Sequence, residues 1–491
     1  MTLPENQINH DEYDDDGGLQ APPRILFWGL ISVILLAVVG ILAGIFIFRE
    51  VLTPGQQQRV IDAVPFMSIL LPPHPAPDAV LPTVAPVNPT AAMDLLNLSI
   101  DPVNPSPEIT EATEVITETP PTEFVPTATP TPQPTEALPT PTATLPPPTT
   151  TPTEMPTQSA QAITPTPNIV SQPAGQRLTW AISHTNTGFN WERQTWNNCG
   201  PTNITMAMSY YGWSRGQDFA RTLIRPNGED RNVSPFELVN FVNNNSNLRA
   251  LYRIGGDLGL LRALINRQFA VIIERSHMFE GYDWLGHYQT LVGYDDSQRI
   301  FTVYDSFLGA DTIETYTDVD NHWQDFNRVF IVVYQPEREA ELFDMLGELA
   351  DQERAAEIAF DVAQAEARAN PQDPFAWFNM GSSLVLLRRY QEASVAYDQS
   401  ISLGLPWRML WYQFGPYEAF YQVGRYQDIL AYVNNTFSTD GGQDVEEAYY
   451  WQGRALLALG ERNQAIAAFQ AAISKNRYFA DARQALTELG A

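Results

Sequence analysis

The sequence predicts an α+β domain followed by an all-α array of helical hairpins, with a long extended segment before both. Three observations predict this architecture. Residues 176–337 show helical patterns first and strand patterns after them, as in α+β folds. Glycines recur at a spacing of 34 residues within 338–491, which indicates repeated pairs of helices. Residues 49–175 are dominated by proline and threonine and cannot bury a core.

Length and charge limit the classes of function. The 491 residues carry a formal net charge of -29, and residues 1–24 form an acidic tail. Binding to nucleic acid needs a basic face, so we expect no nucleic-acid partner. The length is sufficient for two or three domains.

Residues 25–48 form an almost wholly apolar run that is flanked by Arg24 and Arg49. A helix of this length reaches across a bilayer core of about 30 Å. The run is too long for the core of a signal peptide. We therefore predict a single transmembrane helix that anchors the chain in a membrane.

The segment 49–175 is predicted to be a disordered linker. Its stretch Pro72–Pro173 holds 26 of the 39 prolines and no lysine or arginine. Such sequences adopt extended, polyproline-like states and are typical of stalks that hold a domain away from a cell surface. This favours an extracellular position for the folded part, although the basic residues that flank 25–48 slightly favour the reverse.

Ordered patterning returns at about Arg177. Pro201 suits the first turn of a helix that opens at Cys199, and Ser234 with Glu237 forms a capping box for a second helix. Further elements are expected over these ranges: a helix over Asp257–Ile265, and strands over Phe269–Glu274, His287–Tyr294, Ile300–Asp305 and Arg328–Tyr334. The strands predict a largely antiparallel sheet.

Cys199 is the only cysteine of the chain. It therefore has no partner for an intramolecular disulfide or a sulfur-rich metal site. A free cysteine is commonly a buried apolar residue, but this one stands at an expected helix start, where partial positive charge favours a thiolate. No convincing phosphate-binding loop or metal-ligand cluster accompanies it, so we expect no cofactor and no metal.

Three further residues fit the chemistry of a nucleophilic cysteine. His287 begins one strand and Asp305 ends the next, so antiparallel pairing would bring them to the same sheet edge, where Asp305 could hold the imidazole in the productive tautomer. Gln194 lies five residues before Cys199 and could donate a hydrogen bond to a developing oxyanion. Each residue taken alone would more often be structural. We assign structural roles to the other histidines of the domain, which are His184, His277 and His322.

These segments resemble the papain-like peptidases that cut bacteriocin leaders after a double glycine, and most closely the stand-alone bacterial domains of that family. The resemblance covers about residues 177–336 and rests on two motifs: Asn198-Cys199-Gly200-Pro201-Thr202 and Gly286-His287-Tyr288. It implies a papain-like cysteine peptidase fold with Cys199 as nucleophile and His287 as general base and acid. It further implies Asp305 as orienting residue and Gln194 as oxyanion donor. Asn198 stands where the founding members usually have aspartate.

The repeated glycines carry a second resemblance. An aromatic residue precedes each of them by four positions, and three of them are followed after twelve by an alanine: Ala359, Ala393 and Ala465. This pattern resembles the tetratricopeptide repeat, which implies paired antiparallel helices that bind protein segments. We expect residues 480–489 to form a capping helix. Gln427 replaces the usual small alanine and predicts loose packing in the third unit. The four glycines are Gly347, Gly381, Gly415 and Gly453.

Together these patterns predict a cysteine peptidase that acts on peptide or protein amide bonds and binds a protein partner through its repeats. Because papain-like folds also host amidases and transglutaminases, acyl transfer from an amide is the broader prediction. We expect deletion of the repeats to spare turnover of a small peptide ester. The alternative is a catalytically inactive papain-like module that serves as a surface protein-binding scaffold. A glycosylation sequon at Asn203, inside the expected helix of Cys199, favours a bacterial protein.

Overall fold

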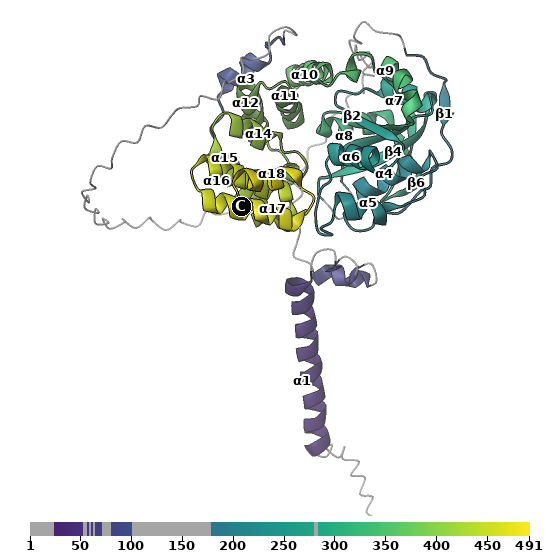
Figure 1. Cartoon of the computed structure of the whole chain (residues 1–491). Coiled ribbons are helices and arrows are strands. Elements are labelled where there is room, and N and C mark those ends of the chain that lie inside the picture. Colours follow the sequence, from purple (N-terminus) through teal and green to yellow (C-terminus); the bar gives the residue numbers. More distant parts are fainter. Residues whose placement is uncertain are drawn as a thin grey trace, which may run out of the picture. The chain divides into compact units, whose positions relative to one another are not determined.

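The computed structural model describes residues 24–52, 56–57, 60–61, 64–70, 80–100, 178–278 and 283–491 (Figure 1). The acidic tail and most of the proline- and threonine-rich linker lie outside these ranges, so the predicted disorder of the linker stays a prediction there.

The apolar run forms helix α1 (Arg24–Phe46), which continues into a π-helical turn at Ile47–Val51. Among the residues that the structure describes, no helix has the length and apolar content that a membrane span requires. The predicted transmembrane helix is therefore not supported, although the helical conformation of the run is.

Residues 80–100 depart from the expected disorder of the linker. They contain a short helix, α3 (Pro89–Leu95), whose first turn is capped by the Asn88 side chain. The Gln364 side-chain amide, in the repeats, donates hydrogen bonds to the carbonyl oxygens of Leu95 and Leu98, at 2.7 and 2.8 Å. The physical reason is composition, because this stretch contains buried leucines where the rest of the linker has proline and threonine. A 3-10 helix also lies at Pro65–Leu70.

The first folded domain is built on one antiparallel sheet in the order β2-β7-β3-β4-β5-β6, with β1 paired to β4. The predicted antiparallel sheet is confirmed. The strands are β1 (Ser183–Thr185), β2 (Arg249–Arg253), β3 (Ala270–His277), β4 (Leu285–Asp295), β5 (Ile300–Asp305), β6 (Gly309–Thr315) and β7 (Phe330–Tyr334).

Helices pack on both faces of this sheet. One face carries α4 (Cys199–Ser209), α5 (Gln217–Ile224) and α6 (Pro235–Asn245), which share a core with alternate residues of β3, β4 and β7. The other face carries α7 (Leu258–Asn266) and α8 (Tyr316–Trp323). The capping box at the start of α6 is present as predicted. Strands β1, β2 and β6 and helices α5 and α8 were not predicted.

The second part is all helical, as predicted. Its helices are α9 (Glu339–Leu346), α10 (Gln352–Ala369), α11 (Pro374–Leu386), α12 (Tyr390–Ser402), α13 (Met409–Tyr412), α14 (Gly415–Gln422), α15 (Tyr426–Ser438), α16 (Glu446–Ala458), α17 (Arg462–Lys475) and α18 (Ala480–Glu488). A β-carbon on Gly381 would lie 2.7 Å from the Tyr397 ring, and one on Gly453 would lie 2.5 Å from the Phe469 ring. These two glycines therefore permit the close helix approach that the repeat pattern predicts.

Two positions differ from the repeat pattern. Gly347 ends α9 with a positive φ of 55°, and nothing lies within 4 Å of its would-be β-carbon, so it is a helix terminator and not a packing glycine. Gly415 begins α14 because Pro416 occupies the first turn, but a β-carbon there would meet the Tyr397 hydroxyl, so this glycine also permits close helix approach. Gln427 itself is exposed, whereas Ile429 and Val433 of the same helix are fully buried, so the expected loose packing of the third unit stays a prediction.

Candidate active site

Cys199 is the first residue of α4, as predicted, and is half-buried. The ten helix residues that follow it are all buried, so the helix start is held firmly against the sheet. Asn198 precedes it and is fully buried, and its amide donates to Gln217 Oε1 at 2.6 Å. The partial positive charge of the helix start is thereby fixed at the thiol.

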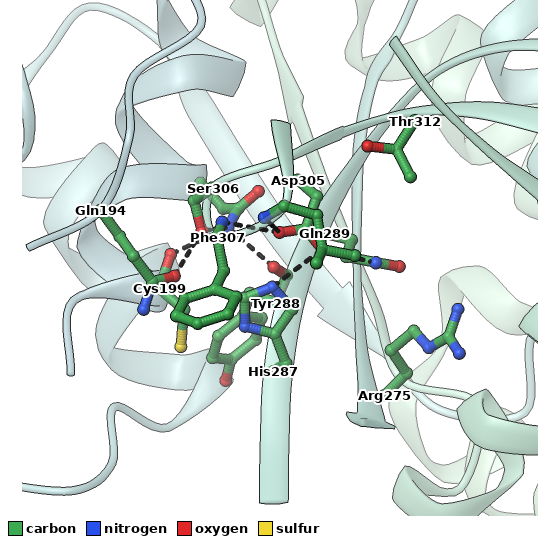
Figure 2. A network of polar contacts seen from close by, with 12 residues as sticks. Gln194, Cys199, Arg275, His287, Tyr288, Gln289, Asp305, Ser306, Phe307 and Thr312 are labelled. Carbon is green, nitrogen blue, oxygen red and sulfur yellow. Dashed lines mark hydrogen bonds and ion pairs between the residues drawn. The ribbon is translucent and has the colours of Figure 1, made fainter. Parts of the chain in front are cut away.

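Strand pairing brings His287 and Asp305 together. Gln289 of β4 stands opposite Asp305 of β5, so His287 lies two residues along β4 on the same face. His287 Nε2 and Asp305 Oδ2 are 3.0 Å apart, and the two side chains are 2% and 0% exposed. Figure 2 shows the Cys199 sulfur on one side of the imidazole and the Asp305 carboxylate on the other.

The electrostatics of this group favour an ion pair. Burial by itself would raise the pKa of Cys199, but a hydrogen bond to His287, its positive charge, and hydrogen bonds from the backbone of Tyr288 and Gly200 lower it overall. Burial would lower the pKa of His287, but the charge and hydrogen bond of Asp305 raise it to about 10. A lowered thiol pKa beside a raised imidazole pKa favours a thiolate paired with an imidazolium.

Asp305 stays ionised in spite of its burial because both of its oxygens have donors. Oδ1 accepts from the backbone N–H groups of Phe307 and Leu308, at 2.6 and 2.7 Å, and Oδ2 accepts from Gln289 Nε2 at 2.7 Å. Burial would raise the pKa of this carboxyl, but His287 and these hydrogen bonds hold it well below its usual range.

Gln194 lies beside Cys199 and is oriented by Ser306 (Figure 2). The Gln194 backbone N–H donates to the Ser306 carbonyl oxygen at 2.8 Å, and the Ser306 hydroxyl donates to Gln194 Oε1 at 2.7 Å. The side-chain oxygen is thus occupied, and the NH2 group is the part of the amide left to donate elsewhere. The structure therefore brings together all four residues that the sequence nominated.

Comparison with known proteins finds similarities in both folded parts of the chain. Residues 186–334 match the model of the Peptidase_C39 like family. The chain carries a C39-like peptidase domain. Residues 446–477 match the tetratricopeptide repeat, which covers α16 and α17. No curated protein matches the chain.

A solved structure reported as a C39-like peptidase from Bacillus anthracis is 13% identical to this chain. The alignment covers 31% of this chain and 96% of that one, with a TM-score of 0.27.

Two residues of the C39-like domain that sequence reasoning missed hold the site in place. Asn203 lies one turn after Cys199, and its Nδ2 donates to the Cys199 and Tyr288 carbonyl oxygens at 3.0 and 2.8 Å. It ties α4 to the strand of His287. Gln289 joins Asp305 to Glu314, with its Nε2 2.7 Å from an oxygen of each. The feature that identifies these two residues is the full burial of their amide side chains. Burial of this kind cannot be read from the sequence.

The other three histidines of the C39-like domain, which the sequence assigns to structural roles, have the following contacts. The His277 ring lies 6.0 Å from that of His287, and burial together with the positive charge of His287 lowers the pKa of His277 to about 4. His184 contacts Asn186, and His322 contacts the Asp318 backbone. The described residues contain no cluster of three or more acidic, histidine or cysteine side chains placed to hold a metal ion.

Proposed function

We propose that this chain is a cysteine peptidase-like hydrolase that acts on amide bonds of peptides or proteins through Cys199, His287 and Asp305. The observation that carries the proposal is the hydrogen-bonded order Cys199–His287–Asp305 at the start of a buried helix. A thiolate beside an imidazolium is the reactive form of such a nucleophile. The family match at residues 186–334 supports the same class of chemistry.

The proposed reaction proceeds in two steps. The Cys199 thiolate attacks the carbonyl carbon, and the C–N bond breaks as the His287 imidazolium gives its proton to the leaving amine. A thioester remains on Cys199. His287, now neutral, removes a proton from water, and the hydroxide displaces the thiolate and releases the acid. Because Asp305 occupies Nε2, the nitrogen that exchanges these protons is Nδ1.

Gln194 is proposed to stabilise the oxyanion of each tetrahedral intermediate. Its amide oxygen is held by Ser306, which leaves the NH2 group as donor. The backbone N–H groups at the start of α4 are the second source of donors. Removal of one such donor in other hydrolases costs about 10²–10³ in turnover.

The test is covalent labelling of the purified folded part with a peptide that carries a thiol-reactive group, followed by mass-spectrometric mapping of the modified residue. We expect a single adduct on Cys199 that forms faster than with the same group on a non-peptide carrier. Equal rates with both reagents would show that the cysteine is reactive but that no peptide is recognised.

A second function has one observation in its favour. The cavity that contains Cys199 has a volume of only about 10 Å³, which is room for about one water molecule. A site with so little space beside the thiol fits a protein-binding scaffold without turnover, in which the repeats bind the partner. Thiol labelling separates the two, because a scaffold has no need to keep the pKa of Cys199 below its ordinary value.

We propose separately that the folded part works outside the cytoplasmic membrane of a bacterium. The support is the proline- and threonine-rich composition of the segment before it. Asn203, the sequon asparagine, is fully buried and holds the site together, so a glycan there is incompatible with the fold. Protease added to intact cells should release the folded part, whereas protection until lysis would place it inside.

A further inference from the structure

The third helical pair departs from the repeat pattern, and the segment that departs from it lies near the Cys199 thiol. Its first helix is broken by Pro416, so residues 407–413 form a separate segment that contains the four-residue helix α13. We call residues 407–413 the wall segment. In a regular unit these residues would lie within the first helix and pack only on other helices.

The wall segment is fixed to the peptidase domain by polar contacts at both ends. Trp407 Nε1 donates to Asp283 Oδ2 at 2.6 Å, and Arg408 Nη1 lies 2.7 Å from Asp283 Oδ1. Gln413 Nε2 donates to the Asp325 carbonyl oxygen at 3.0 Å. Asp283 is buried, so this ion pair is screened little by water and holds the segment in one position.

Tyr412 of the wall segment reaches the active site. Its ring packs against Trp284 and Phe326, with ring centroids 5.8 and 6.1 Å apart. It lies so close to Gly286 that a β-carbon there would be 2.9 Å from the Tyr412 ring. Gly286 directly precedes His287, so Tyr412 lies against the strand that carries the proposed base.

The same tyrosine lines the cavity that contains Cys199. The other lining residues include Gly200, Glu274 and Tyr288, all from the peptidase domain. The cavity is only about 10 Å³ with Tyr412 in place. The ring of a residue from the repeats therefore limits the space beside the thiol.

We propose that Tyr412 is a specificity-determining residue of the peptidase site, and that the repeats supply one wall of the substrate cleft. The inference rests on the proposed function, because it assigns the residue that sets the size of the group accepted beside Cys199. It goes beyond the recruiting role expected of the repeats, since a chain without them would lack this wall.

The decisive experiment measures access to the thiol and needs no turnover. Cys199 is alkylated with iodoacetamide and with a bulky N-aryl maleimide, and the ratio of the two rates is compared between the parent chain and Tyr412→Ala. We expect the bulky reagent to gain about tenfold or more relative to the small one, because one removed group in a pocket has effects of this size. An unchanged ratio in a folded Tyr412→Ala variant would overturn the proposal.

Three further variants keep the test interpretable. Tyr412→Phe retains the ring and should retain the parent ratio. Tyr449→Ala removes a partly buried tyrosine of α16 that does not line the cavity, and should also leave the ratio unchanged. Tyr412→Leu keeps apolar packing if the alanine variant fails to fold, and should give an intermediate ratio. An equal gain in Tyr449→Ala would show that the ratio reports loosening of the repeats.

Peptide substrates then separate this inference from the proposed function. If the parent chain turns over peptides, kcat/KM for a bulky acyl group relative to a small one should rise in Tyr412→Ala. If no peptide is turned over but the alkylation ratio still changes, the proposed function fails and Tyr412 remains the wall of the cavity. If turnover occurs and neither ratio changes, the proposed function stands and this inference fails.

Discussion

The candidate active site and a second buried group of ionisable residues respond to burial in opposite ways. In the site, the imidazole lies between the thiol and the carboxylate and is hydrogen-bonded to both. When all three are ionised, each neighbouring pair has opposite charges. The second group, which we call the acidic cluster, consists of Asp230 and Glu237 of the peptidase domain and Glu446 and Glu447 of α16. Its members are all acids.

Burial dominates the pKa values in the acidic cluster. It raises the pKa of Glu237 to about 8, with the charge of Glu446 adding to the effect. Burial, then the charges of Glu446, Glu237 and Asp230, raise the pKa of Glu447 well above its usual value. Arg225 is the cation that faces this group, but its guanidinium donates mainly to backbone oxygens. Buried charge is kept where a partner of opposite sign is hydrogen-bonded to it, and is given up where the neighbours have the same sign.

The largest expected effect is on the site itself. Cys199→Ala should reduce turnover to the uncatalysed background, because no other thiol exists in the chain. The change removes one half-buried atom, so the melting temperature should move little. Rates and thermal melts of the two proteins check this prediction. Turnover that survives at the parent rate would remove Cys199 from the mechanism.

His287→Ala should remove the cation that pairs with the Cys199 thiolate. The imidazolium and its hydrogen bond lower the pKa of Cys199, so without them burial should raise it above the value of about 8.5 for a free thiol. Alkylation at pH 7 should then slow by about tenfold for each unit of the pKa change. The check is the pH dependence of the alkylation rate. His277→Ala, in the neighbouring strand, is the control and should leave the profile in place.

Asp305→Asn should narrow the pH range over which the Cys199–His287 ion pair exists, because its alkaline limit should move to a lower pH. The carboxylate raises the pKa of His287 to about 10, so an amide in its place should let burial lower it. The imidazolium would then lose its proton at a lower pH, and turnover should fall by about 10²–10⁴. The alkaline limb of the rate profile checks this. Asp295→Asn, at the partly exposed end of the neighbouring strand β4, should change neither limb. A profile equal to the parent in Asp305→Asn would make Asp305 structural.

Glu447→Gln should give the smallest effect of the four substitutions. It should change the stability of the protein. A carboxyl whose pKa is raised by folding binds more protons folded than unfolded, so its contribution is present at low pH and is lost as pH rises through the folded value. For Glu237 this window runs from about 4.5 to about 8. Glu447→Gln removes one acid, so its melting temperature should exceed the parent's by a few degrees at pH 8.

The difference should shrink at pH 5, where the acids of the cluster are mostly protonated. Glu488→Gln, at the exposed end of α18, is the matched control and should show no difference at either pH. A melting difference for Glu447→Gln that is independent of pH would show that folding does not raise the pKa of this carboxyl.

The elements nearest the thiol could be predicted because their signals are local. Pro201 beside Cys199 marks a helix start, and the strand ending at Asp305 was predicted to the residue. Strands β1, β2 and β6 were missed because they are short or partly exposed, and their residues do not show a clear alternation. The ordered stretch 80–100 was missed because proline-rich neighbours dominate its composition.

By itself the sequence determined the order of the parts and the four residues of the candidate site, because helix starts, strand alternation and a 34-residue repeat are properties of nearby residues. The tertiary structure decided which polar groups are buried together. Gln289 and Asn203 orient the site, four acids meet in one cluster, and Tyr412 reaches Cys199 across more than two hundred residues of chain. Such contacts depend on how the helices and the sheet pack, and no local pattern in the chain encodes them.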